Sequence, residues 1–323
     1  LLRMGLAEGL GRCFVTGCAG FIGSHLTEVL LADGNSVTGY DNLSSGSMEW
    51  VRPLLANPRF SFIQADLRDQ EKLTVALQGH DLIWHFGANT DIPGGNQDPR
   101  IDFENDIVGT FNLLQSMRAS GTRKLLFASS STVFGETELK PTPESVGPEL
   151  PITQYGAGKM AGEGLISAFC YLYGMQAWMF RFGNVIGARM GHGVIYDFIQ
   201  KLRRDPRELE ILGDGHQEKN YFLVEDCIDG ILHAYRHDRD KRCDVYHLGN
   251  NTTTRVTEIA SIVADEMGLK DVKHHFTGGR QGWPGDVPVV MYDTTKMHNL
   301  GWQARHTSSE AVRIAARRLL AKA

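Results

Sequence analysis

CFVTGCAGFIG, residues 13–23, joins an apolar run to a glycine-rich turn near the start of the chain. Such a stretch is typical of a strand that turns on glycines into a helix. Without side chains in the way, the N–H groups of the turn and of the helix N-terminus can approach a pyrophosphate. Ile22, Leu26, Val29 and Leu30 then recur at the spacing of one helix face. The stretch therefore predicts a strand, a turn and a helix that together bind a dinucleotide.

An acidic residue, Asp41, ends the next apolar run, residues 36–40. In this position a carboxylate can accept hydrogen bonds from both adenosine ribose hydroxyls of NAD. The same carboxylate would repel the 2′-phosphate of NADP. We therefore expect NAD as the cofactor.

Strand-like and helix-like runs alternate through the first half of the chain. The expected strands are 12–16, 36–41, 60–64, 81–86 and 123–129, and the expected helices are 22–33, 69–78 and 101–119. A helix at 153–172 and a strand at 176–182 continue the series after a Pro- and Glu-rich loop at 136–152. Alternation with helical crossovers predicts a parallel sheet covered on both faces. The expected fold is a Rossmann-type, doubly wound α/β fold.

The pattern changes after about residue 187. A helix at 194–204 and a short strand at 209–212 are followed by mixed short elements and a last helix at 307–321. We expect an NAD-binding domain over 11–186, with interleaved later segments near 220–250, and a smaller substrate-binding lobe mainly over 187–323. Because open α/β sheets bind ligands at the carboxyl ends of their strands, the substrate is expected between the two.

Composition excludes several classes of partner. The formal net charge is -5 with dispersed acidic residues, so nucleic acid is not expected. No apolar stretch approaches the roughly 20 residues that span a bilayer, and residues 1–11 are interpreted as a frayed terminus rather than a secretory leader. The five cysteines lack paired metal-ligand spacing. We predict a cytoplasmic protein with reduced thiols, no metal and no membrane partner.

A tyrosine and a lysine share one face of the expected helix at 153–172. Tyr155 and Lys159 lie at positions i and i+4. The ammonium, joined by the positive ring of oxidised NAD, would lower the pKa of Tyr155 from about 10 and let it act as a base. Residues 129–131, three serines at the end of an expected strand, could bind a substrate oxygen. Taken singly, the Tyr155/Lys159 spacing is most often an ordinary surface pair on a helix. The three serines, taken singly, are most often an ordinary polar end of a strand.

Together and in this order, the motifs resemble those of the extended short-chain dehydrogenase/reductases, and within them the UDP-hexose 4-epimerases. The resemblance spans nearly the whole chain and rests on the glycine turn, Asp41–Gly46, Asp66-Leu67, His85–Ala88, the serines before Val133-Phe134-Gly135, and the Tyr155/Lys159 pair. It implies inversion at carbon 4 of UDP-glucose or UDP-galactose through a 4-keto sugar, with NAD retained. It also implies a homodimer built on the helices at 101–119 and 153–172.

The resemblance assigns individual residues. Tyr155 would be the base, Lys159 would hold the nicotinamide ribose, and Ser130 would be the catalytic hydroxyl. The cofactor would contact Gly17, Gly20, Phe21, Ile22, Gly23, Asp41, Asn42, Ser45, Asp66, Leu67, Phe86, Ala88 and Asn105, besides Tyr155 and Lys159. The substrate would contact Ser130, Ser131, Asn184, Arg189, Val194, Lys219, Arg280 and Val290.

The chain departs from the family pattern at the expected diphosphate site. Lys219 replaces an arginine, and a lysine is a point charge without the bidentate fork. Trp283 replaces a second arginine, whose charge Arg280 or Arg189 would supply. Val290 stands where larger side chains exclude a 2-N-acetyl group, so UDP-N-acetylhexosamines are possible substrates.

Other reactions on the same scaffold are the alternatives. Ser131 and Thr132 occupy the places where related 4,6-dehydratases and UDP-glucuronate decarboxylases carry acids. Without an acid to protonate a leaving hydroxyl, dehydration is disfavoured. The segment after Arg189 lacks the Arg-Pro-Asp of uronate epimerases, which favours a neutral hexose. A non-catalytic NAD-binding regulator is a further alternative, against which the intact Tyr155 and Lys159 count.

Overall fold

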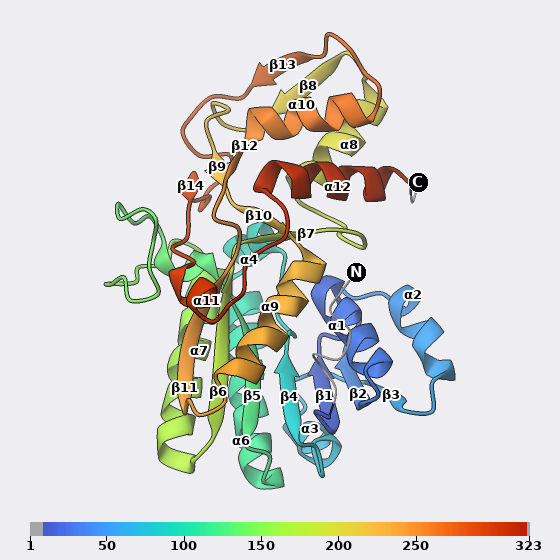
Figure 1. Cartoon of the computed structure of the whole chain (residues 1–323), viewed down its shortest axis with the longest axis vertical. Coiled ribbons are helices and arrows are strands. Elements are labelled where there is room, and N and C mark those ends of the chain that lie inside the picture. The colour runs from blue at the N-terminus through green and yellow to red at the C-terminus, as the bar shows by residue number, and fades with distance from the viewer. Residues whose placement is uncertain (1–8, 322–323) are drawn as a thin grey trace. The chain divides into compact units, whose positions relative to one another are not determined.

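The computed structural model describes residues 9–321 and divides the chain into two compact units (Figure 1). Of the described residues, the first unit comprises 9–135, 147–181 and 231–246. The second comprises 136–146, 182–230 and 247–321. Residues 136–146, placed in the first domain by the sequence analysis, thus belong to the second unit. Residues 1–8, most of the predicted frayed terminus, lie outside the described part.

A seven-stranded sheet forms the centre of the first unit, with the strand order β11-β6-β5-β4-β1-β2-β3. Parallel pairings join β1 to β2 and β4, β2 to β3, and β4 to β5. The order reverses between β1 and β4, and ligands of open α/β sheets bind at such a switch point. The predicted Rossmann-type fold is confirmed. The strands are β1 (Arg12–Thr16), β2 (Ser36–Asp41), β3 (Phe60–Gln64), β4 (Leu82–His85), β5 (Lys124–Ser130), β6 (Gln176–Phe182) and β11 (Cys243–Leu248).

Burial on both faces explains why β1 and β4 are apolar along most of their length. All four residues of β4 are buried, as are the last four of β1. One core of this unit packs Phe14 of β1 with Leu73, Leu113 and Ile166 of three helices. Each such side chain contributes about 1.5–3 kcal/mol by burial. The helices of the unit include α1 (Phe21–Ala32), α3 (Gln70–Ala76), α6 (Gly109–Ser120) and α7 (Gln154–Tyr173).

The helix predicted at 101–119 is present and uninterrupted over 99–120, but it is not α-helical throughout. The chain forms α5 (Pro99–Asp102), then a π-helical segment, η2 (Phe103–Val108), and then α6. Asp98 caps the start of α5 by accepting from the N–H of Arg100 at 3.1 Å. Single π-helical turns are rare and concentrate at functional sites. This one carries a buried acidic residue, Asp106.

The second unit packs α8 (Val194–Arg204), α10 (Val256–Glu266) and α12 (Ser308–Leu320) around an apolar core that includes Phe198 and Val312. The predicted helices at 194–204 and 307–321 match α8 and α12. A capping box between Thr307 and Glu310 fixes the start of α12. The strands of this unit are β7 (Asn184–Ile186), β8 (Glu208–Ile211), β9 (Glu218–Lys219), β10 (Tyr221–Leu223), β12 (Thr254–Arg255), β13 (Lys273–Phe276) and β14 (Val289–Val290).

The expectation of only short elements between residues 213 and 307 is wrong, because two longer helices lie there. In α9 (Val224–His237) residues 226–235 are all buried, including the polar Asp226, Asp229 and His233. In α10 the buried Ile259, Ile262 and Val263 follow helical spacing, which is a signal for this helix. The remaining elements are α2 (Met48–Val51), η1 (Arg52–Ala56), α4 (Ile92–Gln97), η3 (Ser131–Phe134) and α11 (Thr295–Asn299).

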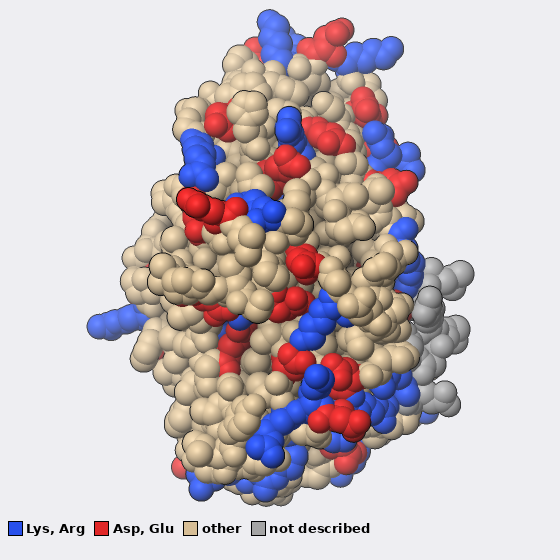
Figure 2. All heavy atoms as spheres, turned by 60° about the vertical axis from the view of Figure 1, so that its left-hand side comes forward, with Lys and Arg blue, Asp and Glu red and all other residues tan. Residues whose placement is uncertain are grey.

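Basic and acidic side chains are intermixed over the face shown in Figure 2. This pattern agrees with the small net charge of -5. Among residues 9–321, no helix is both long enough and apolar enough to cross a membrane.

Candidate active site

The glycine turn after β1 is closed so tightly that side chains do not fit. Gly17 has φ 70°, and a Cβ on it would lie 2.7 Å from the backbone of Phe86 and Gly87 after β4. A Cβ on Gly23 would lie 2.1 Å from the Gly17 carbonyl oxygen. The N-cap of α1, Gly20, has no side-chain cap. The N–H groups at the start of α1 are thus arranged at the β1/β4 switch point as an anion site, which fits a pyrophosphate.

Asp41, at the end of β2, is tied to this turn. Its carboxylate accepts hydrogen bonds from the backbone N–H of Ala19 at 3.0 Å and of Leu43 at 2.8 Å. Burial raises the pKa of Asp41, and the two N–H donors oppose that shift. The carboxylate therefore lies beside the turn, where the adenosine ribose of NAD is expected. Together, the turn and Asp41 fit the cofactor.

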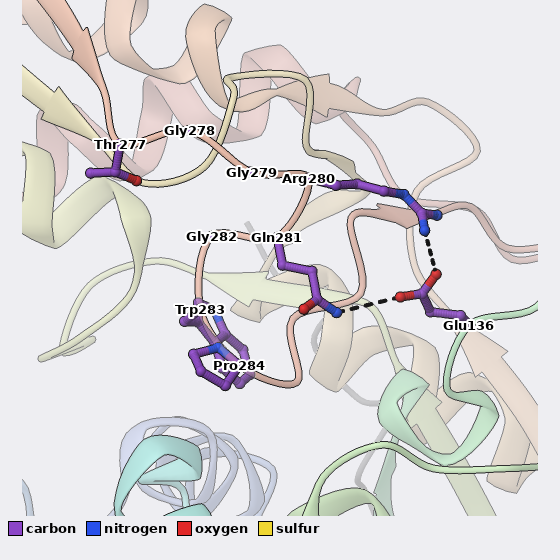
Figure 3. Close-up of a pocket in the computed structure, with 9 residues that line it drawn as sticks. All are labelled: Glu136, Thr277, Gly278, Gly279, Arg280, Gln281, Gly282, Trp283 and Pro284. Atoms are coloured by element: carbon purple, nitrogen blue, oxygen red, sulfur yellow. Dashed lines mark hydrogen bonds and ion pairs between the residues drawn. The ribbon is translucent and has the colours of Figure 1, made fainter.

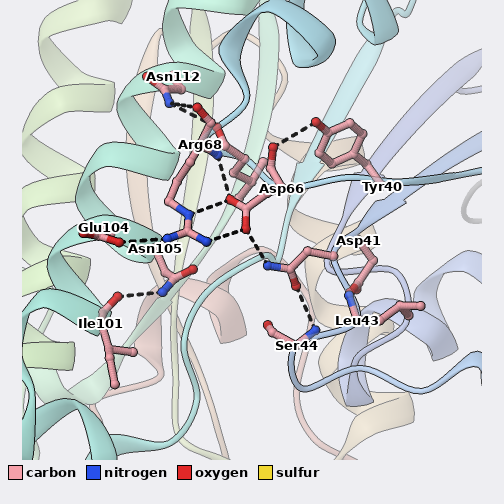
Figure 4. A network of polar contacts seen from close by, with 12 residues as sticks. Tyr40, Asp41, Leu43, Ser44, Asp66, Arg68, Ile101, Glu104, Asn105 and Asn112 are labelled. Carbon is pink, nitrogen blue, oxygen red and sulfur yellow. Dashed lines mark hydrogen bonds and ion pairs between the residues drawn. The ribbon is translucent and has the colours of Figure 1, made fainter.

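A polar network surrounds Asp66, which follows β3 (Figure 4). Arg68 donates to both carboxylate oxygens, from Nε at 2.9 Å and Nη2 at 2.8 Å, and Asn42 donates to one of them at 2.8 Å. The hydrogen bonds from Arg68 are the main reason why the pKa of Asp66 lies well below its usual range. Arg68 also donates to Glu104 at 2.8 Å. Sequence reasoning missed Arg68, although it lies two residues beyond Asp66.

The remaining predicted cofactor residues lie in different parts of the first unit. The side chain of Leu67 packs near Gly87 and Gly109, and Phe86 donates its N–H to Thr16 at 3.2 Å, so both lie close to the switch point. Asn105 instead uses its amide to donate to the carbonyl of Ile101 at 2.7 Å (Figure 4). Ile22 lies in the first turn of α1 with Phe21, Ser45 is exposed in the loop after β2, and Ala88 is partly buried in the loop after β4.

The three residues proposed as catalytic lie together at the carboxyl end of β5. Ser130, the last residue of β5, shares a side-chain hydrogen bond with Tyr155. Tyr155 is in the first turn of α7, whose N-cap Thr153 accepts from the N–H of Gly156 at 3.0 Å. The Nζ of Lys159 lies 5.4 Å from the centre of the Tyr155 ring. The phenol, the hydroxyl and the ammonium thus lie close to one another.

Protein groups shift the pKa of Tyr155 in the direction opposite to the one expected. Burial raises it first, the charges of Asp106 and Asp102 raise it further, and the hydrogen bond from Ser130 lowers it. Burial also lowers the pKa of Lys159, which the same two carboxylates and Glu163 oppose. The expected lowering rested on the ammonium and the nicotinamide ring, and these carboxylates oppose it.

A buried ion-pair network holds α7 against β5 and β6. Glu163, one turn after Lys159, accepts from Ser129 at 2.5 Å and from Nε and Nη2 of Arg181 at 2.9 and 2.6 Å. Arg181 also pairs with Glu149 at 2.6 Å and has only 4% of its side chain exposed. Because Ser129 precedes Ser130, this network fixes the hydroxyl and the helix of the catalytic cluster together.

In the second unit, two of the predicted substrate residues lie on neighbouring strands. Lys219 of β9 is paired in register with Val290 of β14. Its ammonium forms a close ion pair with Asp286, whose side chain is 4% exposed. Asn184 of β7 donates to the carbonyl of Asn220 at 3.2 Å. Lys219 therefore already has an anionic partner, which the sequence did not reveal.

Arg280 lies in a loop that lines an open pocket of about 660 Å³, formed by Glu136 and residues 277–284 (Figure 3). Its side chain is 71% exposed, and its guanidinium pairs with Glu136 at 2.8 Å. Gln281 in the same loop donates to the carbonyl of Asp286 at 3.0 Å. Two of the three candidate phosphate-binding cations, Lys219 and Arg280, thus each pair with a different carboxylate. Ser131 begins η3, Arg189 has φ 73° in the loop after β7, and Val194 begins α8.

Comparison with known proteins places the chain among enzymes of nucleotide sugars. Residues 13–249 match the model of the NAD dependent epimerase/dehydratase family. A UDP-glucose 4-epimerase from Mycolicibacterium smegmatis is 31% identical over 308 residues, 93% of this chain and 96% of that protein. A solved UDP-galactose 4-epimerase is 38% identical with a TM-score of 0.86, covering 96% of this chain and 99% of that one.

The same scaffold occurs with a different reaction. A dTDP-glucose 4,6-dehydratase from Streptomyces venezuelae, solved with NAD bound, has a TM-score of 0.87 and 26% identity. It covers 96% of this chain and 97% of its own. The fold and the cofactor are therefore common to these proteins, whereas the outcome of the reaction varies among them.

Proposed function

The chain belongs to the NAD dependent epimerase/dehydratase family as an NAD-dependent nucleotide-sugar epimerase, and we propose that it inverts carbon 4 of a UDP-hexose such as UDP-glucose or UDP-galactose. The observation that carries the proposal is the cluster of Ser130, Tyr155 and Lys159 at the end of β5. In this cluster Tyr155 would be the base, Ser130 the hydrogen-bonding hydroxyl and Lys159 the cation. Such a set suits reversible oxidation of an alcohol.

Each residue of the cluster has a distinct part in the proposed reaction. Tyr155, as phenolate, takes the proton of the sugar 4-hydroxyl, while Ser130 hydrogen-bonds the same oxygen. Lys159 keeps positive charge beside the phenolate and hydrogen-bonds the nicotinamide ribose. NAD, when bound, would accept a hydride from carbon 4 and return it, and inversion would require the 4-keto sugar to turn over between the two transfers. The proton returns from Tyr155 to the oxygen, and no net oxidation occurs.

The residues after Ser130 support epimerisation over dehydration. Loss of a hydroxyl as water needs a group that protonates it. Ser131 and Thr132, in η3, are not acids at neutral pH. The neighbouring carboxylate Glu163 is bound by Arg181 and Ser129, and is not placed as a free acid.

Val290 supports a wider choice of sugar. A valine on β14, next to Lys219 on β9, leaves more space than a tyrosine. We propose that UDP-N-acetylhexosamines are also accepted. Brisk turnover of UDP-glucose with no detectable turnover of UDP-GlcNAc would refute this part.

We also propose that the active form is a homodimer. The helices at 99–120 and α7 expose apolar side chains, including Phe103 at 55%, Tyr171 at 64% and Leu172 at 72%. Apolar side chains of this size at a helix surface favour burial against a second copy. A monomer at micromolar concentration in a sedimentation experiment would contradict this.

The proposed function is tested by incubating the purified protein with a panel of UDP-sugars without added cofactor. We expect the 4-epimer as the only product, identified by NMR, because the hydride is returned within one active site. Turnover without added NAD would indicate that the cofactor is retained. A 4-keto-6-deoxy sugar or a pentose as product would instead favour a dehydratase or a decarboxylase.

A further inference from the structure

Two buried carboxylates lie behind the catalytic pair without a complete set of hydrogen bonds. Asp102 and Asp106, four residues apart in α5 and η2, are 1% and 3% exposed. Asn89 donates to one oxygen of each, from its N–H to Asp106 at 2.9 Å and from its amide to Asp102 at 2.8 Å. The other oxygen of each is buried and has no hydrogen-bond partner among residues 9–321. Such a group is costly to bury, so its presence calls for an explanation, and a catalytic role is one.

Asp106 faces the turn of α7 between the two catalytic residues. A Cβ on Gly158 would lie 2.9 Å from the Cβ of Asp106 and 3.3 Å from its Oδ2. Gly158 directly precedes Lys159 and lies three residues after Tyr155. The absence of a side chain at Gly158 thus admits the carboxylate to this turn. The π-helical geometry of η2 holds Asp106 there.

The negative charges of Asp102 and Asp106 act on both residues of the catalytic pair, Tyr155 and Lys159. Asp106 and Asp102 both act on Lys159 and on Tyr155, and burial raises the pKa of Asp106 to about 6 although Lys159 lowers it. Asn89 contributes neutral donors only. The other charged or titratable groups that face the two carboxylates or Lys159 are Asp91 before α4, Glu163 of α7 and His85 of β4.

We propose that Asp106, supported by Asp102, is a positioning residue of the catalytic pair: its carboxylate balances the Lys159 ammonium and so sets the pH above which Tyr155 acts as a base. This inference rests on the roles proposed above for Tyr155 and Lys159. A like charge near a phenol disfavours the phenolate, and an opposite charge near an ammonium favours the ammonium. Removing the carboxylate therefore makes both groups lose their protons at lower pH.

The test is the pH dependence of the Asp106→Asn variant, measured on the purified protein with NAD bound. Both limbs of the log kcat profile are expected to move to lower pH, the acidic limb by about one pH unit. A merely structural role would lower kcat without moving the midpoints. The matched control is Glu104→Gln in the same π-helical segment, since that carboxylate is 46% exposed and pairs with Arg68. It is expected to leave both midpoints in place.

A second measurement keeps this inference separate from the proposed reaction. The ultraviolet absorbance of tyrosinate, taken as the difference between a protein and its Tyr155→Phe counterpart, reports the titration of Tyr155 without any substrate. In Asp106→Asn this midpoint is expected to fall by about one pH unit. An unchanged midpoint overturns the inference even if epimerisation is intact. A shifted midpoint supports it even if the sugar chemistry proves different.

Asp102→Asn decides the matter if Asp106→Asn does not fold. Its carboxylate acts on Tyr155 in the same direction, with less effect than that of Asp106. A smaller shift to lower pH in the tyrosinate titration supports the proposal. No shift in this variant overturns it.

Discussion

The catalytic cluster of the first unit and the Arg280 loop of the second hold their charged groups in opposite ways. Lys159 and Arg181 are buried in regular elements, and Arg181 has only 4% of its side chain exposed. Arg280, on the open loop at 277–284, is 71% exposed and pairs with one carboxylate that is itself 36% exposed. Fixed geometry suits groups that move protons, whereas an exposed loop can adapt to different ligands. We therefore expect substitutions in the cluster to act strongly and those in the loop to act weakly.

The largest effect is expected at the proposed base. Tyr155→Phe removes the phenol hydroxyl that hydrogen-bonds Ser130, so kcat should fall by at least about 10³-fold. Bound NAD should be unchanged in amount, because the glycine turn and Asp41 do not involve this hydroxyl. Stopped assays on UDP-galactose, with cofactor content measured after denaturation, give both numbers. Activity within ten-fold of the unsubstituted protein would show that the base is elsewhere.

Removal of the buried Arg181 guanidinium tests whether the buried ion pairs stabilise the protein more than the exposed pair of Arg280 does. Arg181→Met leaves Glu163 and Glu149 without their cation, and breaking a buried pair from one side costs about 3 kcal/mol or more. The free energy of unfolding, from urea denaturation, should fall by that amount. Arg280→Met is the matched control, and an exposed pair should change stability by less than about 1 kcal/mol. Equal losses of unfolding free energy in Arg181→Met and Arg280→Met would show that the buried pair stabilises the protein no more than the exposed pair.

The buried acid behind the cluster predicts a pH-dependent stability. The folded-state pKa of Asp106 is about 6, above its ordinary value of 3.8, so its contribution to stability is present below the ordinary value and is lost as pH rises through about 6. The Asp106→Asn variant has no carboxyl group to ionise at this position, so it does not lose this stability as pH rises. Relative to the unsubstituted protein it should gain about 2 kcal/mol of unfolding free energy between about pH 4 and pH 7. Urea denaturation over that range measures the gain, and Glu104→Gln should show none.

The same contrast explains what the sequence could predict. The strands of the first unit and the glycine turn follow local patterns, since buried parallel strands are apolar throughout and Gly17 has a backbone that other residues rarely adopt. Tyr155 and Lys159 were placed on one helix face by their spacing alone.

What the sequence did not predict depends on contacts between distant segments. Asp106 joins the catalytic pair only through the π-helical turn in η2 and the gap left by Gly158. The pairs of Lys219 with Asp286 and of Arg280 with Glu136 likewise join residues far apart in the chain. A local sequence pattern does not indicate which distant carboxylate a cation will pair with. The sequence therefore identified Lys219 and Arg280 as candidate cations but did not predict that each is paired with a carboxylate.

The smallest effect is expected where the loop charge is already balanced. Glu136→Gln removes the partner of Arg280 and should alter the free energy of unfolding by less than about 1 kcal/mol. If Arg280 helps to bind the diphosphate, the freed guanidinium should lower KM about two-fold while kcat is unchanged, because the substitution adds attraction to an anion without touching the cluster. The change should shrink at high salt, since an exposed charge is screened. Initial rates at low and high ionic strength measure it, with Glu138→Gln in the same segment as the control. A KM that is identical at both salt concentrations would place the diphosphate away from Arg280 and leave Lys219 and Arg189 as its candidate cations.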